Sequence, residues 1–125
     1  MNGNAEQEQQ PEAGHIVDSA RMQDLVSSLG EALQDVVDSY LEESPRMITE
    51  MERACQRGDW EDLERLAHSL KSSSGIFGAR RMVNLSRALE LSARGNETGS
   101  LEAVQEIAVA FEEVRAVLNL YLKTL

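Results

Sequence analysis

The residues with the clearest chemical potential lie around His68. Its imidazole is a nucleophile, Lys71 follows three residues later, and Ser72 and Gly75 carry almost no side chain. At about 100° per residue, a helix with Leu70 on its apolar face places His68 roughly 160° away, and Ser72 and Gly75 near the same direction. The pattern predicts an exposed nucleophile beside a cation. The neighbouring side chains are small, so another protein's concave site could approach the imidazole closely.

The small residues after His68 form an unusual run for a helix. Ser72-Ser73-Ser74-Gly75 is locally unfavourable there, because serine and glycine have poorer helix propensity than alanine or leucine. We therefore expect a role other than stability to explain this run.

Basic residues are concentrated in the same part of the chain. Between residues 65 and 94 the only acidic residue is Glu90, whereas the whole protein has a formal net charge of −10. This concentration suggests attraction to an anionic partner site or to phosphate. The alternative is a solvated helix face, the usual meaning of scattered arginines. The basic residues are Arg65, Lys71, Arg80, Arg81, Arg87 and Arg94.

The other side chains with reactive groups, those of His15 and Cys55, are not expected to have a chemical role. His15 has no nearby cysteine or second histidine, so no ligand or catalytic role is expected for it. Cys55 falls on an apolar stripe at helical spacing and is predicted to be a small core residue. A single cysteine cannot form an internal disulfide, and the sequence shows no signal peptide and no apolar run of membrane-spanning length. We expect a cytoplasmic protein.

Composition favours one helical domain. The chain has 125 residues, of which 42% are hydrophobic, enough for one compact core. Only 4% are aromatic and two are proline, which argues against a β-sandwich or barrel. The 22 acidic residues against 12 basic ones disfavour a chain built mainly to bind nucleic acid or an anionic membrane.

Apolar spacing and capping residues predict the elements. Residues 1–15 are predicted to be a disordered acidic tail, and residues 16–125 a single domain. The expected fold is all-α, an antiparallel up-down-up-down four-helix bundle with a short extra N-terminal helix. Pro45 is expected to kink or restart the second helix. The predicted helices cover Ser19–Leu29, Glu31 to about Gln56, a third that Asp59 caps and Gly78 closes, Ala79–Arg94, and about Ser100 to Lys123.

The segment Ala67 to Ser74, followed by Gly78-Ala79, resembles the signature of histidine phosphotransfer (HPt) domains of multistep two-component phosphorelays. That pattern is a histidine, then leucine, lysine, a small residue that is usually glycine, two more small residues, and a glycine ten positions after the histidine. The chain departs from it at Ser72. The resemblance extends to Gly58-Asp59 and to Leu85-Ala88-Leu89-Glu90, and covers about Ile16 to Leu125.

The resemblance implies roles for single residues. Nε2 of His68 would carry a phosphoryl group between receiver-domain aspartates, and Lys71 would compensate the phosphate charge as a mobile cation. Glu90 matches a position from which a carboxylate could orient the imidazole through its Nδ1–H. The receiver docking face would include Ser72, Gly75, Arg65, Arg80 and Arg81.

The resemblance also implies the partners. They would be receiver domains of response regulators and of a hybrid sensor histidine kinase, with no nucleic acid and no membrane. The protein itself would be a monomeric phosphocarrier without a cofactor and without autonomous kinase or phosphatase activity. The Mg²⁺ required for phosphoryl transfer would belong to the receiver.

Two other functions fit some of these features. One is a degenerate helical scaffold that binds a signalling protein through the same face without phosphorylation; the presence of both His68 and Lys71 argues against it. The other is a nucleic-acid-binding bundle that uses Arg80, Arg81, Arg87 and Arg94, which the net charge of −10 makes unfavourable.

Overall fold

The computed structural model describes residues 16–96 and 100–124. These ranges contain five α-helices and no strand, which confirms the all-α prediction. The acidic tail predicted for residues 1–15 lies outside the described residues. The helices are α3 (Ser19–Leu29), α4 (Ala32–Arg57), α5 (Trp60–Gly75), α6 (Arg80–Arg94) and α7 (Ser100–Lys123).

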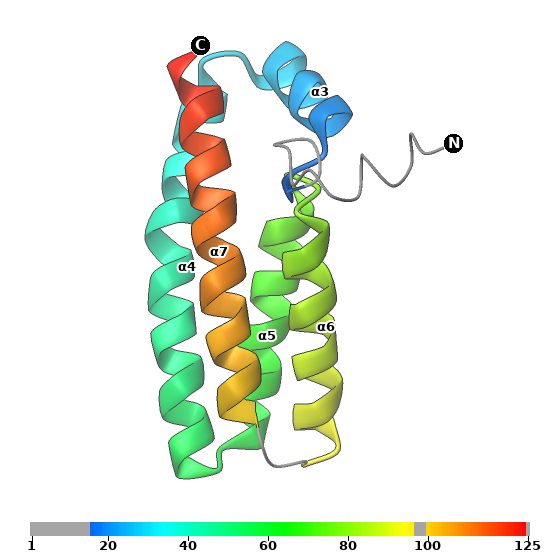
Figure 1. Cartoon of the computed structure of the whole chain (residues 1–125), viewed down its shortest axis with the longest axis vertical. Coiled ribbons are helices and arrows are strands. Elements are labelled where there is room, and N and C mark those ends of the chain that lie inside the picture. The colour runs from blue at the N-terminus through cyan, green and yellow to red at the C-terminus, as the bar shows by residue number, and fades with distance from the viewer. Residues whose placement is uncertain (1–15, 97–99, 125) are drawn as a thin grey trace, which may run out of the picture.

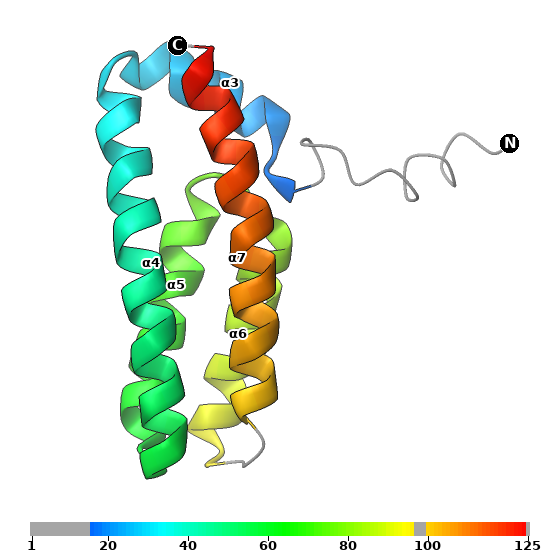
Figure 2. The same cartoon turned by 60° about the vertical axis from the view of Figure 1, so that its left-hand side comes forward.

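The four long helices lie side by side, and α3 crosses one end of them (Figures 1 and 2). α5 packs against α4 and α6, and α7 packs against the same two helices from the other side. α3 contacts the beginning of α4 at the end where α7 finishes (Figure 1). Among the described helices, this arrangement leaves the outer side of α5 uncovered between α4 and α6, with α7 on the opposite side.

The core is built from apolar residues three and four positions apart, as the spacing predicts. On α5, Leu63, Leu66 and Leu70 are buried. Leu101 is an exception to this spacing, because it follows the apolar pattern of α7 but is 39% exposed. It lies in the first turn of α7, and the end of a helix has fewer neighbours to cover it.

Two predicted helix boundaries are corrected by the structure. α4 continues without interruption from Ala32 through Pro45 to Arg57, so the restart considered at Pro45 is wrong. One proline removes one N–H, and packing against neighbouring helices keeps the rest of the helix in place. α5 ends at Gly75 rather than at Gly78, while its predicted N-cap is confirmed, since the Asp59 carboxylate accepts a hydrogen bond from the backbone N–H of Asp62 at 3.1 Å.

Gly78 lies in the turn between α5 and α6, where that turn meets the start of α3. Its φ is +65°, and a Cβ atom there would lie 2.5 Å from Cβ of Asp18. The backbone N–H of Asp18 donates to the carbonyl of Phe77 at 3.2 Å, and the Asp18 side chain caps α3. Only glycine satisfies both the left-handed backbone and the close approach of Asp18.

Gly78→Ala is therefore expected to destabilise the fold, by roughly 3 kcal/mol, because it adds a steric clash to the cost of a left-handed backbone. Gly58 offers a matched control, since its φ is +69° but nothing lies within 4 Å of the added Cβ. Gly58→Ala should cost only about 1 kcal/mol. Urea unfolding of both variants measures the difference, and equal losses would show that contact with Asp18 does not constrain Gly78.

Candidate functional site

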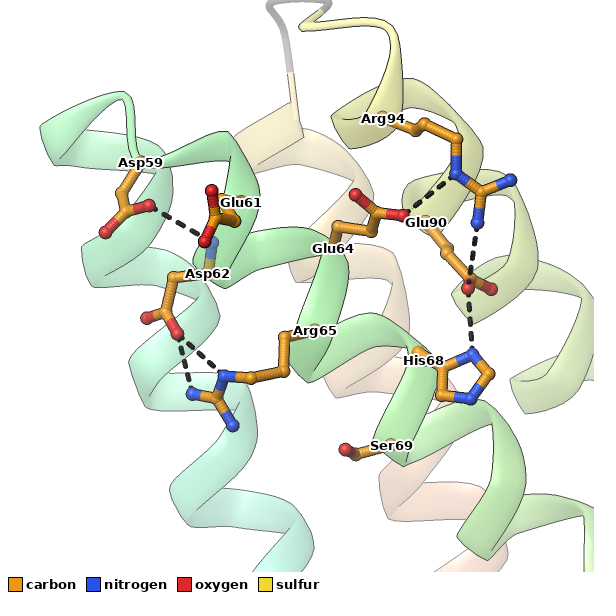
Figure 3. A pocket seen from close by; sticks show the side chains of 9 residues that line it. All are labelled: Asp59, Glu61, Asp62, Glu64, Arg65, His68, Ser69, Glu90 and Arg94. Carbon is orange, nitrogen blue, oxygen red and sulfur yellow. Dashed lines mark hydrogen bonds and ion pairs between the residues drawn. The ribbon is translucent and has the colours of Figure 1, made fainter.

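His68 lies in the middle of α5 on the side that none of the other described helices covers. Its side chain is 59% exposed, whereas Leu66, Ala67 and Leu70 beside it are buried. The exposed position predicted from the helical spacing is therefore confirmed. One ring nitrogen is turned toward Glu90 of α6 and the other points away from it (Figure 3).

Glu90 joins two side chains of α5. Its carboxylate is 6% exposed and lies 2.8 Å from Nδ1 of His68 through Oε2, and 2.6 Å from Nζ of Lys71 through Oε1. The position beside the histidine that the resemblance implies for Glu90 thus agrees with the geometry. The three side chains form one connected group, held by the packing of α5 against α6.

The charge of Glu90 decides which nitrogen of His68 carries the proton. The hydrogen bond from Lys71 lowers the pKa of the Glu90 carboxyl; burial raises it by less, and the hydrogen bond with His68 lowers it further. An ionised carboxylate can only accept hydrogen bonds. In a neutral ring Nδ1 must therefore be the donor to Glu90, and Nε2 keeps its lone pair.

Lys71 of α5 lies against Glu90 of α6, and its expected role of compensating the phosphate charge as a mobile cation stays a prediction. Its side chain is 25% exposed, and its ammonium group is held against Glu90. A nearly buried carboxylate is costly unless a cation and hydrogen-bond donors accompany it, so Glu90 determines where Lys71 lies.

Arg94 extends the group and was not among the residues expected around His68. Its Nε donates to Glu64 of α5 at 2.8 Å, and its second guanidinium nitrogen lies 3.4 Å from Glu90 (Figure 3). Two signals were available: Arg94 follows Glu90 by four residues, and Glu64 precedes His68 by four. Together with His68 these residues line a shallow depression of about 700 Å³.

Three of the five residues expected on the docking face lie on the outer side of α5. Ser72 is exposed and has no hydrogen-bond partner within the part of the chain described. Gly75 is half-buried, and a Cβ there would meet only Val83, at 4.0 Å. Packing thus leaves room for alanine at Gly75. Arg65 lines the depression and pairs with Asp62 at 2.6 Å.

The two arginines expected on the docking face from α6 lie on different sides of that helix. Arg81 donates to Glu113 of α7 at 3.3 Å. It precedes Glu90 by nine residues, which is about half a turn away around the helix. The structure therefore brings Arg81 to α7 and not to His68. Arg80 is exposed at the start of α6, on the outer side of that helix.

The three serines after His68 have separate surroundings. Ser74 is buried and its Oγ lies 2.8 Å from the hydroxyl of Tyr40, while Ser73 donates to the carbonyl of Leu70 at 3.2 Å. Burial raises the pKa of Tyr40 to about 12, so its hydroxyl stays protonated. The expectation that something other than stability explains the run is wrong for Ser74, which joins α5 to α4. For Ser72 and Gly75, the expectation of a role other than stability stays a prediction.

Glu90→Gln should make stability less dependent on pH. The folded pKa of Glu90 lies below its ordinary value of 4.5, so ionised Glu90 stabilises the fold above that pH. This stabilisation is lost as pH falls through the lower folded pKa. The difference in unfolding free energy between wild type and Glu90→Gln should be largest at pH 7 and shrink below pH 4.5. Urea titrations across this range test it.

A matched variant controls for the general effect of removing one carboxylate. Glu61 is exposed and makes no ion pair with any described residue. The difference in unfolding free energy between wild type and Glu61→Gln should stay near zero across the same pH range. The same pH dependence in both variants would contradict the role given to Glu90.

Across residues 16–96 and 100–124, no three histidine, cysteine, aspartate or glutamate side chains come together as a metal site. None of the helices in these ranges has the length and apolar character needed to span a bilayer.

Comparison with known proteins gives a family and a fold. The family model described as "Hpt domain" matches residues 35–117, which include His68, Lys71 and Glu90. The crystal structure of histidine-containing phosphotransfer protein B (HptB) from Pseudomonas aeruginosa PAO1 superposes with a TM-score of 0.83 at 22% identity. The match covers 88% of this chain and 96% of that one. The comparison with curated proteins found no significant match.

Proposed function

The chain belongs to the Hpt domain family, whose members transfer phosphoryl groups through a histidine in phosphorelays, and on this premise we propose that His68 is its phosphorylated residue. One observation carries the proposal. His68 is 59% exposed, and its Nδ1 lies 2.8 Å from the ionised Glu90, which leaves Nε2 with a lone pair facing outward. The single experiment that tests it is phosphoryl transfer from a receiver domain, followed by mapping of the labelled residue.

The transfer step follows from this geometry. The lone pair of His68 Nε2 attacks the phosphorus of a receiver's aspartyl phosphate, the new N–P bond forms, and the P–O bond to the aspartate breaks. The aspartate leaves as a free carboxylate. The ring keeps its Nδ1 proton and becomes cationic, and Glu90 opposes that charge at 2.8 Å. Transfer to a second receiver is the same step in reverse.

Most of the charge in the transition state is expected to be neutralised by the partner. Mg²⁺ and the acidic pocket that holds it would belong to the receiver, so this chain supplies the nucleophile and the surface on which the receiver docks. Lys71 and Glu90 act here as positioning residues: Lys71 helps to lower the pKa of Glu90, and the ionised Glu90 fixes the tautomer of His68.

Lys71→Ala should slow phosphoryl transfer several-fold without abolishing it. The variant removes the cation that lowers the pKa of Glu90 but leaves the nucleophile intact. Single-turnover transfer from a phosphorylated receiver measures the change, and Lys71→Arg should recover part of the rate because it restores a cation. Complete loss of transfer would mean that Lys71 acts on the phosphoryl group itself.

The test of the central proposal uses a purified receiver domain labelled on its aspartate. Incubation should move the label to this protein as an acid-labile phosphoramidate. Peptide mapping should place it at residue 68 and leave the peptide containing His15 unlabelled. Label confined to any other residue would overturn the assignment of His68.

The finer architecture is part of the same proposal. We infer an antiparallel up-down-up-down bundle of α4, α5, α6 and α7 with α3 as the extra N-terminal helix, supported by the packing of α5 and α7 against both α4 and α6. The receiver domains of response regulators and of a hybrid sensor kinase are the proposed partners. A cytoplasmic monomer without kinase or phosphatase activity of its own remains the expectation from the sequence.

The degenerate-scaffold alternative is not favoured. A scaffold that only binds its partner would have no need for the connected group of His68, Glu90 and Lys71, in which a nearly buried carboxylate is held by two side chains of another helix.

A further inference from the structure

Charges on the two sides of His68 differ in sign, and we propose that this polarity sets the orientation in which a receiver domain docks. The proposal rests on the proposed function, because it concerns the surface around the same histidine. One side is formed by α6 and the other by α4, with the exposed ridge of α5 between them. We name the two sides the α6 flank, represented by Arg80 and Arg87, and the α4 flank, represented by Glu43 and Glu50.

The α6 flank is cationic. Arg80 and Arg87 are both exposed and lie seven residues apart, so they share one side of the helix. Arg87 is about 60° around the helix from Glu90, on its outer side. No carboxylate among the described residues lies within ion-pair distance of either arginine; the polar partner of Arg87 is the Asn84 side chain at 3.4 Å. Both guanidinium groups can meet an anionic partner.

Other basic residues of α6 are already paired, which separates them from this flank. Arg81 is bound to Glu113 of α7, and Arg94 is bound to Glu64 of α5 at 2.8 Å. Their charges are largely offset within the protein. The positive charge that a partner meets beside His68 therefore comes from the outer stripe of α6.

The α4 flank is anionic. Glu43 and Glu50 are exposed and lie seven residues apart on one side of α4. Glu43 lines a cleft of about 270 Å³ together with Ser73 and Ile76 of α5, which places this stripe beside α5. The pKa of Arg65 is raised mainly by its hydrogen bond with Asp62, and the nearby charge of Glu50 contributes.

Two cations near the α4 flank have carboxylate partners of their own. Arg46 lies between the two glutamates in sequence and pairs with Glu42 at 3.2 Å, and Arg65 pairs with Asp62 at 2.6 Å. Glu43 and Glu50 themselves make no ion pair within the described ranges. This flank thus presents two carboxylates that a partner can bind.

A docking partner must match this polarity to place its aspartate correctly. In-line transfer tolerates only a narrow range of positions around Nε2, so a receiver rotated by half a turn over His68 would be unproductive. Opposite charges across an interface accelerate encounter and suppress wrong orientations. The receiver's contact surface should therefore be anionic over Arg80 and Arg87 and cationic over Glu43 and Glu50.

Exchanging the charges of the two flanks tests the proposal. The variant Glu43→Lys, Glu50→Lys, Arg80→Glu, Arg87→Glu keeps the net charge at −10 but reverses the polarity. With a receiver that phosphorylates the wild type, transfer to this variant at low salt should be slower by about tenfold or more. The difference should shrink at high salt, because exposed charges are then screened.

Two controls separate orientation from other effects. Phosphoramidate, a small donor that needs no docking, should label His68 in wild type and variant alike, so the readout is the ratio of receiver transfer to phosphoramidate labelling. Glu43→Lys with Glu50→Lys is compared with Glu102→Lys and Glu106→Lys, two exposed glutamates of α7, which make the same change in net charge on the opposite side. Only the α4 pair should lower the ratio.

The outcomes for this proposal and for the proposed function are distinct. A ratio that is the same for wild type and the exchanged variant would overturn the polar docking face while leaving phosphotransfer through His68 intact. If neither phosphoramidate nor any receiver labels His68 in the wild type, the proposed function itself fails. Thermal unfolding of each variant confirms that it is folded at the assay temperature.

Discussion

A His68→Gln variant should accept no phosphoryl group from a phosphorylated receiver. The glutamine amide has no basic nitrogen lone pair with which to attack phosphorus, so the expected loss is complete rather than partial. The fold should persist, because the His68 side chain is 59% exposed and contributes mainly its hydrogen bond with Glu90. One such bond contributes about 1 kcal/mol to stability.

The measurement is uptake of acid-labile label from a receiver, with urea unfolding of the same preparation. His15→Gln is the matched control, since it removes the other histidine of the chain and should leave labelling unchanged. Label on the His68→Gln protein equal to that of the wild type would remove His68 from the mechanism, and loss of label in the His15→Gln variant would show that uptake also requires His15.

Ser72→Arg should have the second-largest effect, with transfer slowed by about tenfold or more while stability is kept. Ser72 is exposed one turn beyond His68, so a long side chain there would occupy the space that a docking receiver needs. Arginine also has a better helix propensity than serine by a few tenths of a kcal/mol. The melting temperature should therefore stay equal to that of the wild type or rise slightly.

Val109→Arg is the matched control for that substitution. Val109 is 62% exposed on α7, on the opposite side of the molecule, and the variant introduces the same side chain and charge. It should transfer at the wild-type rate. Unchanged transfer in a folded Ser72→Arg protein would show that the receiver does not dock over this part of α5, even if His68 is the phosphorylated residue.

Features that depend on one helix alone were predictable from the sequence. The ends of α3 and the exposed direction of His68 agree with the structure, because both follow from the residues within a few turns of the chain. Capping by Asp59 is equally local, since the bond spans three residues. The motif around His68 could thus be recognised without knowledge of its neighbours.

Contacts between helices could not be predicted from the spacing of residues within one helix. Helical periodicity defines a direction on each helix, but it does not define how far a neighbouring helix is rotated or shifted along its axis. The expectation for Glu90 came from a resemblance, and nothing in the spacing indicated that Glu90 would hold Lys71 at 2.6 Å. Arg81 illustrates the same limit, because its turn toward Glu113 depends on where α7 lies.

The small residues after His68 also combine a property visible in the sequence with contacts that only the tertiary structure determines. Their low helix propensity was visible in the sequence, and it marked the segment after His68 as unusual. Only the packing of α5 on α4 decided that Ser74 meets Tyr40 at 2.8 Å, and only the path of the chain into α3 placed Asp18 against Gly78. The sequence therefore determined where a nucleophile could be exposed. The tertiary structure decided its tautomer, because the carboxylate that accepts its proton comes from a residue 22 positions away on another helix.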